Sequence, residues 1–228
     1  MNMIVLHTTK YKDSSLILHA YTQDSGRKGF LISGLGKKKE KISLFHPLSI
    51  IDYETNLKKY GNLSYLKEYS PSFPLNNIRS NIYKSSISIY LSELLYRCLR
   101  EEYSDNNLYS FLIKSILELE RISENYSNFH LWFTIRLTFI LGFLSDSGPS
   151  GPFNNNNHKE SIYTNSFSTK DIEIIENYNN ENYLNCSILT FSATQRDAFL
   201  SNMIKYLEDQ LAISINIKSI KILHQIFQ

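Results

Sequence analysis

The spacing of apolar residues changes once along the chain, about a third of the way in, and this change constrains the fold most. Before it, apolar residues stand at every second position, as at Leu16 and Leu18, which is the period of a half-buried β-strand. After Pro71 the period becomes three to four residues, as in an amphipathic helix. The sequence therefore predicts an α+β chain, with a β module at residues 1–70 and a helical module at 71–228.

Turn residues divide the β module into five short strands. The first strand contains Ile4 and Leu6, and the second runs from Leu16 to Ala20. The other three strands are expected at Gly29–Leu35, Leu48–Thr55 and Leu63–Tyr69. Five short strands within about 70 residues indicate a small closed barrel.

The helical module should contain several helices joined by polar connections. Helices are expected at about residues 77–101, 106–123, 127–143, from 168 onward, at 192–211 and at 219–227. Asp105 is the expected N-cap of the second helix. The third helix is apolar nearly all round and should be buried. Residues 145–160 are rich in Ser, Gly, Pro and Asn, and should form a loop.

Composition excludes several classes of protein. Hydrophobic residues make up 42% of the chain, which is enough for a core. Two cysteines, Cys98 and Cys186, cannot form a disulfide framework or a four-Cys zinc site, and they favour a reduced, cytoplasmic setting. The most apolar run, Phe129–Leu144, is short for a bilayer and contains charge, so no membrane span is expected.

Positive charge is concentrated in the β module. Residues 1–69 hold 11 Lys and Arg against 6 Asp and Glu, whereas the rest hold 13 against 16. Six of these basic residues lie between positions 27 and 41, namely Arg27, Lys28, Lys37, Lys38, Lys39 and Lys41. Such side chains on a barrel loop can follow a phosphate backbone without reading bases. A solvated loop that keeps the protein soluble explains them about equally well.

Catalytic patterns are weak, and we expect no enzyme activity, cofactor or metal site. Asp171, Glu173 and Glu176 mostly share one polar helix face. The six histidines lack metal-ligand spacing, and no Gly-rich phosphate loop follows a strand. Three aromatic residues on the strands are suited to base stacking but are interpreted as core residues: Tyr21, Phe30 and Tyr53.

An ordered set of short motifs resembles the RecO family of recombination mediators. The motifs are Ile4–Thr8, Tyr11–Ser15, Tyr21-Thr22, Gly26–Lys28, Ser33–Lys38, Phe45–Leu48, Phe129–Leu131, Arg136-Leu137, Leu141–Phe143, Ser219–Leu223 and Ile226-Phe227. Each motif alone is common, but the ordered set spans nearly the whole chain. The resemblance implies an N-terminal OB-fold and a helical C-terminal domain.

The resemblance also implies a function in DNA repair and homologous recombination. Relatives bind single- and double-stranded DNA, anneal complementary strands, and act with RecR to help RecA displace the single-strand-binding protein SSB. They act in the bacterial cytoplasm, at the nucleoid. Many carry a four-Cys zinc site after the long buried helix. Here the corresponding loop at 145–160 has no cysteine and one histidine, His158, so we expect the zinc site to be absent.

Relatives also bind the acidic C-terminal tail of SSB, which requires local cations beside an apolar pocket. Arg121 and Arg136 are the candidates for this site. Pairing of Arg136 with a buried acid such as Glu93 or Glu118 is slightly favoured instead. A second class of function also stays open: a protein-docking adaptor whose barrel does not bind DNA directly.

Overall fold

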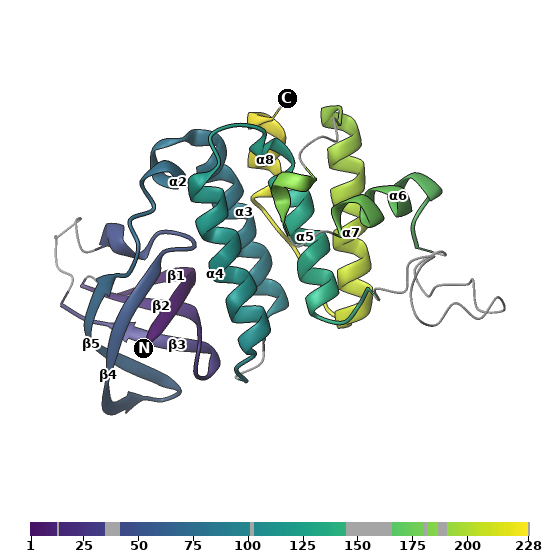
Figure 1. The fold of residues 1–228 in the computed structure, drawn as a ribbon. Coiled ribbons are helices and arrows are strands. Elements are labelled where there is room, and N and C mark those ends of the chain that lie inside the picture. The colour runs from purple at the N-terminus through teal and green to yellow at the C-terminus, as the bar shows by residue number, and fades with distance from the viewer. Residues whose placement is uncertain are drawn as a thin grey trace. The chain divides into compact units, whose positions relative to one another are not determined.

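The structure, a computed structural model, describes residues 1–12, 14–34, 42–100, 103–144, 166–179, 182–186 and 191–227. The chain forms two compact units. The first comprises Met1–Ile122 with Ile217–Leu223, and the second comprises Ser123–Asn216 with His224–Gln228. The change from strands to helices after residue 70 therefore falls inside the first unit, in which three helices accompany the strands (Figure 1).

Five strands close into a barrel, which confirms the predicted OB-fold. They are β1 (Asn2–Lys12), β2 (Ser15–Thr22), β3 (Gly26–Ile32), β4 (Ile50–Tyr60) and β5 (Leu63–Pro71). The order around the barrel is β1-β2-β3-β5-β4. Antiparallel pairing of Asn2–Ile4 with Ile50–Asp52 closes it, and β3 with β5 forms its one parallel contact among the described strands.

Several strand boundaries differ from the prediction by up to five residues, and two of them, the start of the third strand and the end of the fourth, show the cause. The third strand begins at Gly26 and not at Gly29, because the Gly26–Lys28 segment pairs with β2 across a tight turn. The fourth strand continues to Tyr60 because β5 returns beside it, with Tyr60 opposite Leu63. Both differences come from pairing with another strand, which hydrophobic alternation along one segment does not report.

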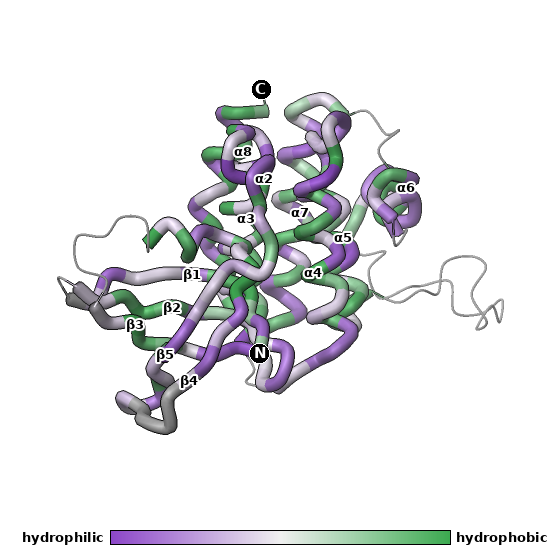
Figure 2. Tube along the Cα trace, turned by 60° about the vertical axis from the view of Figure 1, so that its left-hand side comes forward, coloured by the Kyte–Doolittle hydropathy of each residue, from purple (hydrophilic) through white to green (hydrophobic). Residues whose placement is uncertain are grey.

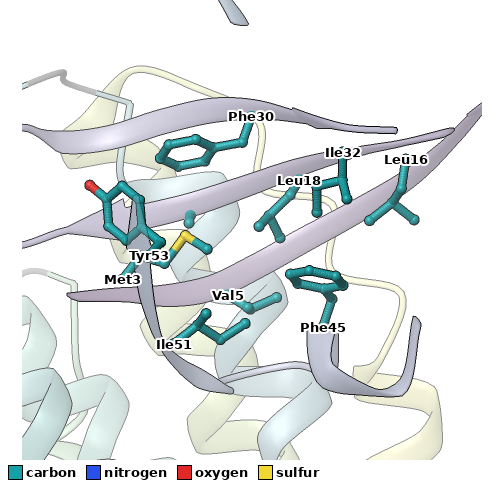
Figure 3. Close-up of a cluster of buried hydrophobic side chains, with 10 residues drawn as sticks. Met3, Val5, Leu16, Leu18, Phe30, Ile32, Phe45, Ile51 and Tyr53 are labelled. Carbon is teal, nitrogen blue, oxygen red and sulfur yellow. The ribbon is translucent and has the colours of Figure 1, made fainter. Parts of the chain in front are cut away.

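The barrel interior is filled by side chains that alternate along the strands (Figure 3). The buried cluster consists of Met3, Val5, Leu16, Leu18, Ala20, Phe30, Ile32, Phe45, Ile51 and Tyr53. Phe45 is the one member of this cluster that does not lie on a strand. It belongs to the short helix η1 (Ser43–Phe45), between β3 and β4. Each fully buried aromatic or branched side chain contributes about 1.5–3 kcal/mol to stability. The alternation found in the sequence thus corresponds to the inner face of the barrel.

Three helices follow the barrel in the first unit: α2 (Asn76–Ser80), α3 (Ile82–Cys98) and α4 (Asn106–Arg121). The single helix predicted at 77–101 is thus two helices. The break is at Asn81, whose backbone is extended and whose side chain accepts hydrogen bonds from the amides of Tyr83 and Lys84. A side-chain cap therefore starts α3 afresh. Asp105 caps α4 as predicted.

Helix α3 is bound directly to the barrel. The Ser92 hydroxyl donates to the Leu6 carbonyl of β1 at 2.5 Å. At the β2–β3 turn, Gly26 has a φ of +63°, and a Cβ there would lie 2.2 Å from the Tyr103 carbonyl oxygen. Only glycine fits this turn, because both the left-handed backbone and the close approach exclude a side chain.

The second unit contains η2 (Tyr126–Asn128), α5 (Phe129–Ile140), α6 (Thr169–Tyr178), η3 (Tyr183–Asn185) and α7 (Ala193–Leu211). The last helix, α8 (Ile220–Ile226), includes residues of both units. The prediction that the apolar third helix is buried is confirmed for α5. Ser168 and Ser192 form capping boxes at the predicted starts of α6 and α7. Every helix that the structure describes is too short or too polar to traverse a bilayer.

Candidate nucleic-acid interface

Arg27, the first basic residue singled out in the sequence, is bound inside the first unit. Its Nη1 donates to the carbonyl oxygens of Tyr96 at 3.0 Å and of Leu99 at 2.7 Å. Its guanidinium carbon also lies 4.4 Å from the centre of the Tyr96 ring. Arg27 therefore joins β3 to the C-terminal end of α3, where the helix dipole favours a cation. Its assignment as a DNA contact stays a prediction.

The other predicted basic residues have different settings. Lys28 lies 3.9 Å from Asp24, and both side chains are well exposed, so this ion pair contributes little. Lys37, Lys38, Lys39 and Lys41 lie outside the described residues. Their role as DNA contacts stays a prediction.

Two histidines adjoin Arg27 on the barrel surface facing α3. The ring centres of His7 and His19 lie 4.6 Å and 5.3 Å from that of Tyr96. Burial lowers the pKa of both histidines, and the neighbouring arginines lower it further: chiefly Arg97 for His7, and Arg27 for His19. Both rings are thus neutral near pH 7, and the charge at this junction comes from the arginines.

The predicted aromatic residues of the strands are core residues, as the sequence favoured. Tyr21, Phe30 and Tyr53 are each less than 5% exposed. The rings of Phe30 and Tyr53 meet edge to face, 5.2 Å apart between centres (Figure 3). The Tyr53 hydroxyl donates to Asp24 Oδ1 at 3.3 Å. Phe30 and Tyr53 lie in the barrel interior, whereas the Tyr21 ring packs against that of Tyr109 on α4, so none of the three rings is open to a base.

Two other tyrosines lie on the surface of the barrel. Tyr11 at the end of β1 is 37% exposed, and Tyr60 at the end of β4 is 50% exposed. Their hydroxyl oxygens are 3.0 Å apart, at hydrogen-bond distance. The sequence pattern predicted no DNA contact at Tyr11 or Tyr60. The available signal was the lysines directly beside them, in Lys10-Tyr11-Lys12 and Lys58-Lys59-Tyr60.

The two arginines proposed for an acidic peptide belong to different compact units. Arg121 is exposed at the end of α4 in the first unit. Arg136 on α5, in the second unit, is partly buried and donates from Nη1 to the side-chain oxygen of Asn179. Its guanidinium carbon lies 5.9 Å from the centre of the Phe139 ring. The hydrogen-bond partner is a neutral amide and not the carboxylate considered from the sequence. Glu93 instead accepts hydrogen bonds from Lys218 and Ser219.

The structure shows no constellation for metal binding or thiol chemistry among the residues it describes. No three His, Cys, Asp or Glu side chains there are grouped to hold an ion. Cys98 is buried, and burial raises the pKa of its thiol to about 12. A thiol in that environment is inert. His158 lies outside the described residues.

Known proteins resemble the chain along most of its length. The model of the recombination protein O N-terminal region matches residues 1–74, and that of the C-terminal region matches residues 79–147. The DNA repair protein RecO of Azobacteroides pseudotrichonymphae genomovar. CFP2 is 34% identical over 233 residues, which cover 98% of this chain and 97% of that protein.

Two further relatives carry the same name. RecO of Phocaeicola vulgatus is 40% identical over 141 residues, 61% of this chain and 58% of that protein. RecO of Flavobacterium psychrophilum is 27% identical over 233 residues, 98% of this chain and 97% of that protein. Together with the closed five-stranded barrel and the helices that follow it, these matches establish that the chain belongs to the RecO family of DNA repair proteins.

Proposed function

We propose that this protein is a non-catalytic recombination mediator that binds and anneals single-stranded DNA. With RecR, it helps RecA to load onto DNA covered by SSB. The observation that carries the proposal is the similarity to RecO over 98% of the chain, on a barrel of OB-fold topology. Barrels of this type bind oligonucleotides on one face and in two adjoining loops.

Charge supports the DNA-binding part of the proposal. The barrel sequence, residues 1–69, has five more basic than acidic residues. Annealing requires two polyanions to approach each other, so the protein must neutralise phosphates and show little sequence preference. A set of lysine ammonium groups meets both requirements, because an ammonium binds a phosphate as a point charge and does not read bases.

The SSB tail is the second macromolecular partner in this proposal. An acidic peptide that ends in an apolar residue needs a cation for its carboxylate and an apolar surface for its side chain. Arg136 offers a guanidinium on the most apolar described helix, next to Phe139. Because its partner Asn179 is neutral, the positive charge of Arg136 is not cancelled by that contact.

A protein-docking adaptor is the alternative, and a gel-shift experiment separates the two. The full-length protein is titrated into labelled single strands and duplexes of the same sequence, with and without RecR. We expect a shifted single strand whose affinity falls steeply with salt, and faster pairing of complementary strands. Absence of any shift at low salt, in both the presence and absence of RecR, would exclude a DNA-binding mediator and leave the adaptor.

A further inference from the structure

Tyr11 and Tyr60 form an exposed aromatic pair across two hairpins of the barrel. Their ring centres are 6.2 Å apart and the rings are inclined by 60°, with the hydroxyl oxygens 3.0 Å apart. Large aromatic side chains are normally placed in the core or at interfaces. Here 37% and 50% of the two residues are exposed, although the barrel interior beneath is filled by other side chains.

The position of the pair on the barrel is informative. Tyr11 lies one residue before the end of β1, where the chain turns into β2, and Tyr60 is the last residue of β4, where the chain turns into β5. In OB-folds, the β1–β2 and β4–β5 connections border the face that binds oligonucleotides. Through the contact between these hydroxyls, the ends of β1 and β4 meet at one point.

The surroundings of the pair suit a polyanion. Lys10, next to Tyr11, is exposed, and Lys12, Lys58 and Lys59 are close neighbours in the sequence. Outside the grey tip of their hairpin, much of β4 and β5 is hydrophilic (Figure 2). Basic residues beside exposed aromatic rings are the combination with which proteins hold single-stranded nucleic acid: the cations follow the backbone and the rings stack on bases.

The hydrogen bond joins the two tyrosines through their hydroxyls. The bond to Tyr60 raises the pKa of the Tyr11 hydroxyl above its usual value. A purely structural role, in which the pair only joins the two hairpins, needs the hydroxyls but not the exposed ring faces. The two roles thus make different demands on the side chains.

We propose that Tyr11 and Tyr60 form a platform on which bases of single-stranded DNA stack. This inference rests on the proposed function and adds the residues that contact the bases. The lysines bind backbone phosphates whatever the base beside them. The platform, in contrast, binds a base only when that base is not already stacked on its neighbours in the DNA. It therefore favours single strands over duplexes, in which the bases are already stacked.

The first test uses the unaltered protein. Fluorescence anisotropy compares its affinity for oligothymidylate with that for an oligonucleotide of the same length whose central nucleotides are abasic. Both carry the same phosphates, so the lysines bind both equally. A stacked base is worth roughly 5- to 150-fold in affinity, from alanine substitutions at other stacking sites. We expect the abasic strand to bind more weakly by a factor in this range.

The second test uses variants of the full-length protein. Tyr11→Ala and Tyr60→Ala should each lower the affinity for oligothymidylate by a factor in the same range, with an unchanged salt dependence, because every phosphate-binding cation is kept. The double variant Tyr11→Phe/Tyr60→Phe keeps both rings without the hydroxyls and should bind within about twofold of the unaltered protein, since stacking uses the ring face. Tyr103→Ala is the matched control, because Tyr103 is 80% exposed and is not part of the pair; it should leave affinity unchanged.

The outcomes separate this inference from the function on which it rests. If oligothymidylate binds but the abasic strand binds equally well, the platform is refuted while DNA binding stands. The same conclusion follows if the Ala variants, folded by circular dichroism, bind as tightly as the Tyr103→Ala control. If the unaltered protein binds neither strand at low salt, the proposed function itself fails, and the platform with it.

Discussion

Arg27 of the barrel covers the ring of Tyr96 on α3, with the guanidinium carbon 4.4 Å from the ring centre. The same guanidinium donates to the Tyr96 carbonyl. One arginine therefore contacts both the side chain and the backbone of one helix residue, by a cation–π contact and a charged hydrogen bond. With the hydrogen bond from Ser92 to Leu6, this contact joins the strands to α3 within one compact unit, although the sequence changes its period between them.

Replacing Arg27 should weaken this junction. Arg27→Lys keeps the charge but removes the planar guanidinium, which bonds two carbonyls and covers a ring at once. We expect the free energy of unfolding to fall by about 1.5–3 kcal/mol, the value of a charge-assisted hydrogen bond. Urea denaturation followed by circular dichroism measures it. Lys28→Gln, which removes an exposed charge on the same strand, should stay within about 0.5 kcal/mol of the unaltered protein. Equal urea midpoints for Arg27→Lys and Lys28→Gln would contradict the proposed junction.

His130 should make the second unit sensitive to acid. Its burial, with Arg196 and His224 nearby, lowers its pKa to about 3. The unfolded chain takes up this proton near pH 6.5, whereas the folded chain does not until about pH 3. Stability is therefore highest above about pH 6.5 and falls as the pH decreases, by up to about 1.4 kcal/mol per pH unit.

The variant His130→Phe removes the titrating group and keeps an aromatic ring. Between about pH 7 and pH 5 the unaltered protein should lose about 2 kcal/mol more stability than this variant. The emission of Trp132, the one tryptophan, which is buried in the same helix, reports unfolding of this unit in urea. An identical pH dependence in the two proteins would show that His130 does not control acid sensitivity.

The Lys37–Lys41 segment should set the salt dependence of DNA binding. Changing Lys37, Lys38, Lys39 and Lys41 to Gln should weaken binding to all sequences and reduce the salt slope by about 0.7 for each phosphate that is no longer neutralised. The matched control changes four exposed lysines of the helices, namely Lys114, Lys170, Lys205 and Lys221. It removes the same net charge. Identical slopes in both variants would place the DNA site elsewhere.

The purified protein should contain no stoichiometric zinc. The chain has two cysteines, and the Cys98 thiol is held protonated by burial, which raises its pKa, whereas a zinc ligand must be a thiolate. Elemental analysis is the measurement, and a chelator should leave the melting temperature unaltered. About one zinc per chain would refute this expectation and make Cys186 and His158 the candidate ligands.

Arg136 should bind the carboxylate of the SSB tail. Arg136→Gln should lower the affinity for a labelled tail peptide by roughly tenfold or more, because a charge-assisted hydrogen bond is worth about 1.5–3 kcal/mol. Affinity for single-stranded DNA should not change. Fluorescence anisotropy measures both, with Arg121→Gln testing the second candidate and the exposed Arg100→Gln as control. Unaltered peptide affinity in folded Arg136→Gln would exclude this residue.

Local chemistry made several features of this protein predictable from its sequence. The five strands follow from alternation and turn residues, and the helix starts after Asp105, Ser168 and Ser192 follow from side chains that bond amides two or three residues away. The burial of α5 follows from its lack of a polar face. Each of these features depends on residues that lie only a few positions apart in the chain. Their spacing can therefore be seen in the sequence without knowledge of the tertiary structure.

Only the tertiary structure decided which side chains face outward and what they contact. The contact of Arg27 with Tyr96 and that of Tyr11 with Tyr60 join residues 69 and 49 positions apart. The sequence marked Arg27 as a basic residue for DNA, and it predicted no DNA contact at Tyr11 or Tyr60. Partners at such separations depend on barrel closure and strand register, because a shift of one residue turns a side chain to the opposite face. Composition and periodicity therefore predicted the fold and its charge, whereas the placement of individual cations and rings required the closed barrel.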